Sequence, residues 1–339
     1  MRSKRLAMLL GGVVVASMLA TGCGNSGAGK SGTAQADYPA KPVHVIVPMA
    51  AGGPSDLTAR SMEKLSSKYL GQALVIENKT GAGGVLGYNE IVSAAADGYT
   101  LGLAATNMIL QPLYGGTEYT YCEEFYPVAQ AVSNPIAVAV LSDSPIQTLE
   151  DLMAYTNEHP GELKYAYTNV GSLPHVASAM FVSTTGAQME AVPFQGGSDS
   201  MTAFLGNNVQ VCFTQISELK GHAANNAVRI LAVATEERLE NFPDIPTFKE
   251  KGIDIVSATW FGIVAPKNIP EEVKGKVVES FKEIINDPEF IKTAEDLGYI
   301  VDYLGPDELA AKWETEQAVY KDIIEKSGIG EEMARQAGK

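Results

Sequence analysis

Short apolar runs alternate with stretches of helical periodicity from residue 38 to near the end of this sequence. The apolar runs are three to six residues long, which is typical of buried strands. The predicted strands are Val43–Val47, Leu74–Ile76, Thr100–Ala105, Val138–Leu141, Lys164–Tyr167, Met189–Val192, Val209–Phe213 and Ile230–Val233. The stretches between them carry apolar residues three and four positions apart, which predicts amphipathic helices. The predicted helices are Leu57–Leu70, Leu149–Glu158, His175–Ser183, Ser198–Leu205 and Glu271–Ile285.

The helix predicted at Glu271–Ile285 has the clearest apolar face. Its apolar stripe consists of Val273, Val277, Val278, Phe281, Ile284 and Ile285. Alternation of strands and helices along the whole chain predicts an α/β fold, with mainly parallel sheets flanked by helices. In such sheets ligands bind at the loops that follow the carboxyl ends of strands, so candidate binding residues are sought there.

The composition is that of an ordinary globular protein, with 45% hydrophobic and 19% charged residues. At ~150 residues per domain, the 339 residues indicate two domains. The net charge of −15 disfavours nucleic acid as a partner, because phosphate binding needs a basic surface. Three cysteines are too few for a disulfide scaffold, and the four histidines lie too far apart for a zinc site. We expect no metal and no cofactor.

The first 22 residues have the organisation of an export signal. Arg2, Lys4 and Arg5 form a basic end, and Leu6–Leu19 is apolar and uncharged. This stretch is shorter than the ~20 apolar residues that a permanent transmembrane helix needs. The next residues, LATGC at positions 19–23, resemble a bacterial lipobox, whose cysteine is acylated after cleavage. We therefore predict a lipoprotein signal peptide over residues 1–22 and lipidation of Cys23, with a soluble exported protein as the alternative.

Residues 23–37 are predicted to form a flexible tether. Gly24–Ala36 contains no large apolar residue and cannot collapse onto a core. Within it, Gly24–Ser31 fits the G-x-x-x-x-G-K-S spacing of a phosphate-binding P-loop. That motif binds phosphate only between a buried strand and a helix, whereas here an export signal precedes it and small residues follow. We therefore reject a nucleotide site in this segment.

Beyond the tether, a series of loop motifs follows the predicted strands in order. The motifs are YPAKPV (38–43), AGGPSD (51–56), ENKTGAGG (77–84), DGYTL (97–101), FYPV (125–128), GS (171–172), VPFQGG (192–197), PDIPT (243–247) and WFG (260–262). In this order they resemble the solute receptors of tripartite tricarboxylate transporters. The resemblance covers the chain from Tyr38 to nearly its end.

The resemblance implies a two-lobed periplasmic-binding-protein (Venus flytrap) fold that closes over one small carboxylate-bearing molecule. It implies two crossings between the lobes, which we place near Pro135–Val138 and Ser257–Gly262. Residues 38–136 and 261–339 would then form lobe 1, and residues 137–260 lobe 2. The chain departs from the family at Pro193-Phe194-Gln195-Gly196, where the family commonly has Pro-Tyr-Lys-Gly. This departure removes a hydroxyl and a positive charge from the loop.

The loop Gly52-Gly53-Pro54-Ser55-Asp56 is the first candidate binding site. Pro54 suits the first position of a helix, so Gly53 is predicted to be the cap. The amides at this helix start carry partial positive charge and suit a carboxylate. Asp56 either caps its own helix, or contacts an ammonium group of the ligand, or shares a water molecule that bridges to the ligand. Lys and Arg are absent from this loop and from the other candidate loops described next. We therefore expect backbone amides, hydroxyls and bridging water to hold the ligand.

Further candidates follow other strands. Thr106 and Asn107 can offer a hydroxyl and an amide, or form an ordinary turn. Gly171 and Ser172 lie between a strand and a helix, with His175 one turn later. Ser172 and His175 together could indicate a hydrolase, but the G-x-S-x-G motif is absent and no acid is placed to orient the histidine.

The last candidates lie at the ends of two later strands. Phe194, Gln195, Gly196 and Gly197 precede a helix, and their amides would face the first cluster across the cleft. Phe194 would pack on the carbon chain of the ligand or belong to the core. Thr214 ends the strand Val209–Phe213 and is a further candidate donor.

Three functions are consistent with the sequence. The first is a monomeric receptor, lipid-anchored outside the cytoplasm to the bacterial cell envelope, that delivers a di- or tricarboxylate or a related acid to integral membrane permease subunits. The second is an exported serine hydrolase that uses Ser172 and His175. The third is a ligand sensor for a membrane signalling protein. We favour the first and predict that the protein is not an enzyme.

Overall fold

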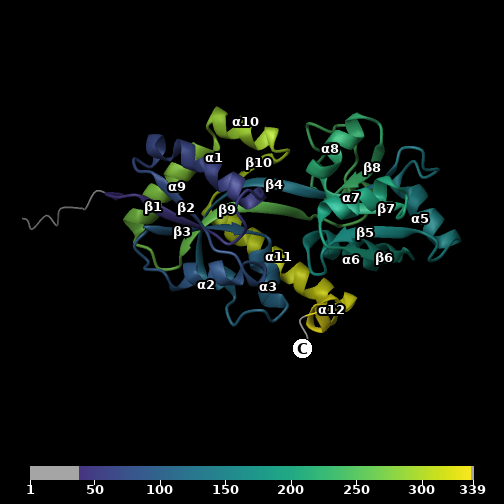
Figure 1. Cartoon of the computed structure of the whole chain (residues 1–339), viewed down its shortest axis with the longest axis horizontal. Coiled ribbons are helices and arrows are strands. Elements are labelled where there is room, and N and C mark those ends of the chain that lie inside the picture. Colours follow the sequence, from purple (N-terminus) through teal and green to yellow (C-terminus); the bar gives the residue numbers. More distant parts are fainter. Residues whose placement is uncertain (1–37, 337–339) are drawn as a thin grey trace, which may run out of the picture. The chain divides into compact units, whose positions relative to one another are not determined.

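The computed structural model describes residues 38–336, whose helices and strands are shown in Figure 1. The predicted signal peptide, Cys23 and the tether lie outside the described residues. The strands are β1 (Val43–Val47), β2 (Leu74–Asn78), β3 (Thr100–Ala105), β4 (Phe125–Leu141), β5 (Lys164–Thr168), β6 (Glu190–Phe194), β7 (Val211–Gln215), β8 (Val228–Val233), β9 (Ala258–Pro266) and β10 (Ile300–Leu304). The helices are α1 (Pro54–Tyr69), α2 (Val85–Ser93), α3 (Asn107–Leu113), α4 (Tyr121–Glu124), α5 (Leu149–Glu158), α6 (Leu173–Thr185), α7 (Gly197–Leu205), α8 (Ile216–Ala224), α9 (Glu271–Ile285), α10 (Pro288–Asp296), α11 (Pro306–Ser327) and α12 (Ile329–Gln336), with 3₁₀ turns η1 (Ala82–Gly84) and η2 (Lys249–Lys251).

Every strand and helix that the sequence predicts is present, with bounds that differ by a few residues. The sequence analysis missed β9, β10, most of β4 and the helices α2, α3, α4, α8, α10, α11 and α12. In β4 the polar residues Gln130 and Asn134 interrupt the apolar run, although both are buried. The Gln130 Nε2 donates to Asp302 Oδ2 at 2.7 Å, and the Asn134 Nδ2 donates to Ser217 Oγ at 2.7 Å. Hydrogen bonds within the protein therefore allow these polar side chains to be buried in a strand.

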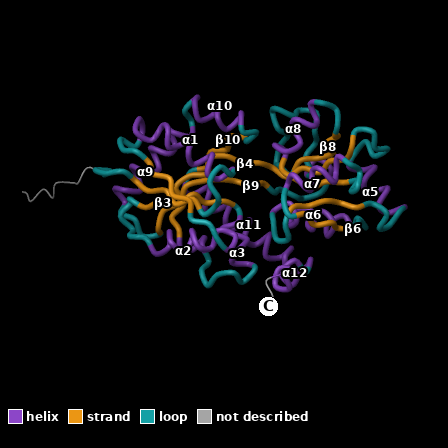
Figure 2. The backbone as a smooth tube through the Cα atoms, in the orientation of Figure 1, coloured by secondary structure: helices purple, strands orange, loops and turns teal. Residues whose placement is uncertain are grey.

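Strand β4 connects two groups of strands (Figure 2). From Phe125 to Pro135, β4 pairs with β9, and from Ile136 to Leu141 it pairs with β7 and β8. The backbone amide of Ile136 donates to the carbonyl of Ser257 at 2.9 Å, directly before β9 begins. The first group has the order β2-β1-β3-β9-β4, with β10 also on β4, and the second has the order β4-β7-β5-β6, with β8 also on β4.

The outer strands of both groups are parallel, as the sequence predicts. Strand β1 pairs in parallel with β2 and β3, and β5 pairs in parallel with β6 and β7. The strands that pair with β4, and the β3–β9 pair, are antiparallel. The sheet is therefore mixed, whereas the sequence predicted mainly parallel sheets, because every strand that pairs with β4 runs antiparallel to it.

Each group of strands is covered by helices. In α9 the predicted apolar stripe is buried except for Val278, which is partly buried. The stripe packs in one hydrophobic cluster with residues of α1, α10 and the first strands. Helix α11 contacts α3 and β4 of the first group and also α6 of the second. Helix α11 thus contacts both groups, and we keep the lobe boundaries predicted from the sequence as a proposal.

Two further features of residues 38–336 are the state of the cysteines and the character of the helices. Cys122 and Cys212 are free thiols, and Cys212 is buried between strands of the second group. In residues 38–336 no helix combines the length and the apolar character that crossing a membrane requires.

Candidate ligand-binding site

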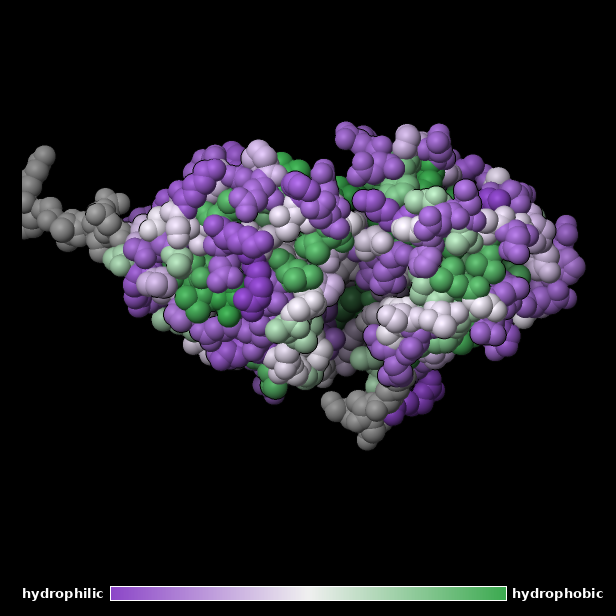
Figure 3. Space-filling model, turned by 45° about the horizontal axis from the view of Figure 1, so that its top comes forward, coloured by the Kyte–Doolittle hydropathy of each residue, from purple (hydrophilic) through white to green (hydrophobic). Residues whose placement is uncertain are grey.

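A cavity of about 730 Å³ lies between the two groups of strands. Residues from α1, β3 and α3 line one side, and residues from the β5–α6 loop and the β7–α8 junction line the other. Polar residues of β4 and β9, including Asn134 and Thr259, also line it. The space-filling view shows the hollow between the two halves of the described chain (Figure 3). Its volume suits a small metabolite, since ligand sites commonly enclose about 300–1,000 Å³.

The start of α1 forms part of the first side of the cavity. Gly53 is the cap residue and Pro54 is the first helical residue, as predicted. Gly53, Pro54 and Ser55 line the cavity, and no side chain caps this helix. An uncapped helix start leaves backbone N–H groups available to an anion. Gly52 lies outside the lining with φ +77°, in the left-handed region that favours glycine.

Asp56 does not line the cavity and is bound within its own loop. The residue is 1% exposed, and its Oδ2 accepts hydrogen bonds from the Gly52 amide at 2.8 Å and from Arg60 Nε at 2.9 Å. Burial by itself raises the pKa of the Asp56 carboxyl, but the Arg60 and Gly52 hydrogen bonds outweigh it and lower the pKa overall. Asp56 therefore stabilises the loop before α1 and leaves the helix start to another anion.

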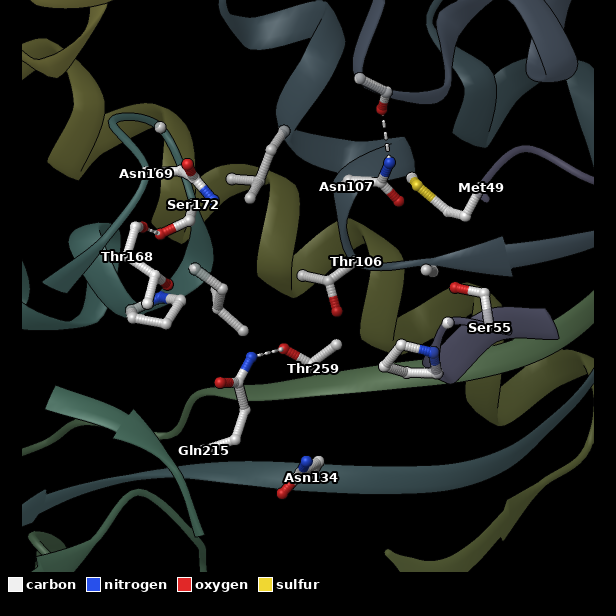
Figure 4. Close-up of a pocket in the computed structure, with 18 of the residues that line it drawn as sticks. Met49, Ser55, Thr106, Asn107, Asn134, Thr168, Asn169, Ser172, Gln215 and Thr259 are labelled. Carbon is white, nitrogen blue, oxygen red and sulfur yellow. Dashed lines mark hydrogen bonds between the residues drawn. The ribbon is translucent and has the colours of Figure 1, made fainter. Parts of the chain in front are cut away.

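Thr106 and Asn107 both line the cavity, but their side chains have partners in the protein. The Thr106 hydroxyl donates to the Ala258 carbonyl at 3.2 Å and accepts from the Trp260 amide at 3.1 Å. The Asn107 Nδ2 donates to the Gly83 carbonyl at 2.6 Å. These bonds join the β3–α3 junction to β9 and to η1, so both residues give the wall a defined shape. Figure 4 shows both side chains and draws the bond of Asn107.

On the opposite side, Gly171 and Ser172 line the cavity at the start of α6. The Ser172 hydroxyl donates to the Thr168 carbonyl and accepts from the His175 backbone amide at 3.4 Å, which makes it the helix cap. Asn169, which the sequence analysis missed, also lines the cavity, with φ +45°. Figure 4 shows Thr168, Asn169 and Ser172 together on this wall.

His175 lies beneath this wall and does not line the cavity. Its ring stacks on Tyr167 with centroids 4.0 Å apart, and its Nδ1 accepts from the Gly171 amide at 3.2 Å. Burial lowers the pKa of His175 to about 4, so the ring is neutral at pH 7. A nucleophilic serine needs a hydrogen bond from its hydroxyl to the imidazole. The recorded partners of the Ser172 hydroxyl are instead backbone groups.

The structure does not bring the Phe194–Gly197 loop into the cavity lining. Gly196 caps α7, and the Glu218 carboxylate lies beside this helix start, 2.8 Å from the position that a Cβ atom on Gly197 would take. Thr214 is buried, and its hydroxyl donates to Glu218 Oε2 at 2.6 Å. Gln195 is exposed outside the cavity. A carboxylate of the protein itself therefore lies where an anionic ligand was expected.

The sequence analysis also missed Gln215, Ser217, Glu218 and Thr259. Gln215 Nε2 donates to Thr259 Oγ1 at 3.4 Å, which joins the end of β7 to β9 (Figure 4). Gln215, Ser217 and Glu218 directly follow the strand predicted at Val209–Phe213, so the strand-end rule could have identified them. Among the described residues that line the cavity, Glu218 is the one Asp or Glu, and none is Lys, Arg or His.

Known proteins with similar sequences and structures identify the family of this chain. Residues 58–329 match the tripartite tricarboxylate transporter family receptor. A UPF0065 protein of Cupriavidus necator is 30% identical, over 87% of this chain and 90% of the relative. The crystal structure of a Polaromonas TctC solute-binding protein matches with a TM-score of 0.81 and 29% identity, over 85% of this chain and 99% of that one. MatC of Rhodopseudomonas palustris with bound malate matches with a TM-score of 0.67 and 27% identity, over 85% and 100%.

The family match covers most of the described chain, and the matching structures have the two-lobed fold that the sequence resemblance implied. The family consists of solute-binding receptors that act outside the cytoplasm. The chain belongs to the tripartite tricarboxylate transporter receptor family.

Proposed function

We propose that this chain is an extracytoplasmic receptor that binds a small carboxylate-bearing metabolite in the cavity and delivers it to the membrane subunits of a tripartite tricarboxylate transporter. The observation that carries the proposal is the cavity between the two groups of strands, with the uncapped start of α1 in its wall. Malate bound to MatC supports a carboxylate as the ligand class.

The ligand carboxylate is held by neutral groups in this proposal. The amides at the start of α1 would receive it, together with the hydroxyl of Ser55. Within residues 38–336, the cavity lining provides no Lys or Arg for a salt bridge. Buried hydrogen bonds are screened by salt far less than exposed charge pairs, so affinity should depend only modestly on ionic strength.

A panel of di- and tricarboxylates, aromatic acids and amino acids tests the proposal. Ligand at ~100 times its dissociation constant adds ~2.7 kcal/mol of stability, which raises the melting temperature measurably. Binding of a carboxylate that leaves the acid chemically unchanged is the expected result. If no carboxylate in the panel raises the melting temperature, the proposed ligand class is wrong.

Membrane anchoring is a separate part of the proposal and rests on the LATGC sequence before Cys23. Cys23→Ala should move the protein from the membrane fraction to the soluble fraction and leave ligand affinity unchanged. An unacylated wild-type protein in the soluble fraction would contradict the anchor. Uptake of the ligand by cells that lack the receptor gene would contradict the assignment to a transporter and favour a sensor.

The absence of catalysis is also part of the proposal. The neutral His175 ring bonds Gly171, and the Ser172 hydroxyl caps α6, which argues against a hydrolase. Ser172→Ala should lower the free energy of unfolding by about 1 kcal/mol, as for the loss of other helix caps. Sustained conversion of a ligand by the wild type that disappears in this variant would favour the hydrolase instead.

A further inference from the structure

Glu218 is a negative charge in a cavity proposed to bind an anion. It lies in the first turn of α8 and lines the cavity beside Ser217 and Gln215. Its carboxylate accepts a hydrogen bond from Thr214, and within residues 38–336 it forms no ion pair with a Lys, Arg or His. Glu218 is exposed to the open cavity, so its charge is available to a ligand.

The two sides of the cavity therefore differ in the groups that they offer. The α1 side offers backbone N–H groups and the Ser55 hydroxyl, which favour a carboxylate. The α8 side offers a carboxylate, which favours a cation or a strong hydrogen-bond donor. A plain dicarboxylate would place one of its negative charges toward Glu218, and the described part of the lining holds no Lys, Arg or His to offset the repulsion.

We propose that Glu218 selects carboxylic acids that also carry an ammonium group, so that the receptor binds an amino acid in preference to the corresponding plain acid. This inference rests on the proposed function, because the carboxylate of the ligand is held at the start of α1. The ammonium group pairs with the Glu218 carboxylate, which Thr214 holds in place. The pair becomes stronger as the lobes close and water leaves the cavity.

A local structural role for Glu218 is the competing explanation. Its carboxylate lies beside Gly197 at the start of α7, where a negative charge stabilises the helix. Such a role would change the stability of the protein, but it would not distinguish between two ligands that differ in one substituent. The test therefore compares ligands within one variant as well as variants with one ligand.

Succinate, malate and aspartate form a matched series, because they share four carbons and two carboxylates and differ in hydrogen, hydroxyl or ammonium at one carbon. Glutarate, 2-hydroxyglutarate and glutamate form the same series with five carbons. Isothermal titration of the whole chain with each acid should show the ammonium member bound at least about tenfold more tightly than the plain member in one series, as expected for a hydrogen bond between charged groups. In Glu218→Gln this preference should disappear, while the affinity for the plain acid stays the same or increases.

Asp199→Asn is the matched control. Asp199 lies in the first turn of α7 and is exposed, so this variant removes a charge from the same helix start without touching the cavity lining. It should keep the preference for the ammonium member. Equal loss of preference in both variants would show a general effect of net charge and would overturn the proposal.

Other results of the same titrations would contradict the selection for an ammonium group. If Glu218→Gln weakens the plain and ammonium members equally, or if the hydroxyl member binds as tightly as the ammonium member, the selection for an ammonium group is wrong. If the plain member is preferred by the wild type, Glu218 does not select amino acids, although the receptor still binds carboxylates. If no member of either series binds, the inference fails, and the other acids of the panel decide whether the proposed function fails with it.

Discussion

Asp56 and Glu218 are two carboxylates beside helix starts on opposite sides of one cavity, and their surroundings differ. Asp56 is 1% exposed and accepts hydrogen bonds from Gly52 and Arg60 of its own loop. Glu218 is exposed to the cavity and accepts one from Thr214. The carboxylate of Asp56 is thus used within the protein, so the nearby amides remain open to an anion. The carboxylate of Glu218 faces the ligand space and makes the same kind of helix start unsuitable for one.

The comparison shows why a glycine-led helix start is not by itself an anion site. The sequence predicted amide clusters at Gly52–Asp56 and at Phe194–Gly197, and the two patterns look alike. In the structure, three residues of the first loop line the cavity and none of the second does. The acidic residues beside the two helix starts also differ, because Asp56 is hydrogen-bonded within its own loop, whereas the Glu218 carboxylate lies 2.8 Å from the position that a Cβ atom on Gly197 would take.

The largest effect is expected from removing the Asp56 carboxylate. Asp56→Ala leaves Gly52 without its partner and Arg60 without its ion pair, and it should lower the free energy of unfolding by about 2.5 kcal/mol, within the range for hydrogen bonds to a charged group, because the remaining Arg60 charge is 43% exposed and stays solvated. Urea denaturation at pH 7 measures this change. Affinities for plain and amino acids should fall together, since Asp56 shapes the loop and does not face the ligand.

The same variant has a predicted pH dependence. The pKa of Asp56 is lower in the folded protein than in the unfolded chain, so its contribution to stability is present above the ordinary aspartate range of ~3.9 and is lost as the pH falls through the lower folded value. The difference between wild type and Asp56→Ala should therefore be full at pH 7 and shrink below pH ~4. A difference that stays constant over this range would show that the charge of Asp56 is not responsible.

A third carboxylate, Glu316 on α11, extends the comparison because its hydrogen bond and its nearby cation do not fully compensate for the energetic cost of burying its charge. Trp260 Nε1 donates to Glu316 Oε2 at 2.9 Å, and the nearest cation, Lys312, is 3.9 Å away. Burial raises the pKa of Glu316 to about 7, although Lys312 and Trp260 oppose the shift. Above pH 7 the folded protein therefore carries a charge that costs stability, and below the unfolded value of ~4.3 this cost is absent.

Glu316→Gln tests whether the buried charge of Glu316 lowers the stability of the folded protein. The amide keeps an acceptor for Trp260 and removes the charge, so the variant should be more stable than the wild type by about 2 kcal/mol at pH 8, and the gain should vanish near pH 4. Thermal denaturation across this pH range measures the change. A gain that is equally large at pH 4 would mean that packing, and not the buried charge, separates the two proteins.

Most of the strands and fewer than half of the helices of the described chain could be predicted from the sequence, and elements such as β3 and α9 were found because they follow the periodicity of buried apolar residues. The first part of β4 could not, because its buried polar residues are satisfied by partners distant in the sequence, such as Asp302 for Gln130. The binding site could likewise be predicted only in part. Gly53 and Ser172 follow from loop position, whereas the cavity position of Glu218 depends on how β7 and α8 lie against β4 and α7.

A smaller effect is expected from giving α1 a cap of its own. Gly53 has φ −81° and ψ 173°, a conformation that serine adopts readily as a helix cap. In Gly53→Ser the new hydroxyl would accept from a first-turn amide and compete with the ligand carboxylate, so affinity for every acid should fall about tenfold, the loss of one hydrogen bond to a charged group. Gly53→Ala is the control, because its methyl group meets the Ala50 carbonyl in the same way but cannot accept a hydrogen bond. Equal losses in both variants would mean that the start of α1 does not hold the carboxylate.

The smallest effect is expected from Thr214, which positions Glu218. Thr214 is 1% exposed, and Thr214→Val keeps its shape while removing the hydroxyl that donates to Glu218 Oε2 at 2.6 Å. The carboxylate stays in the cavity but loses its fixed orientation, so affinity for the preferred amino acid should fall about two- to fivefold, in line with one hydrogen bond worth about 0.5–1 kcal/mol. Affinity for the plain acid should not change in isothermal titration. Thr202→Val, which removes an exposed hydroxyl of α7 that bonds Ser198, should leave both affinities unchanged. If Thr214→Val weakened the plain acid as much as the amino acid, Thr214 would act on the cavity wall as a whole, and the difference between the two sides of the cavity could not be assigned to the Glu218 carboxylate.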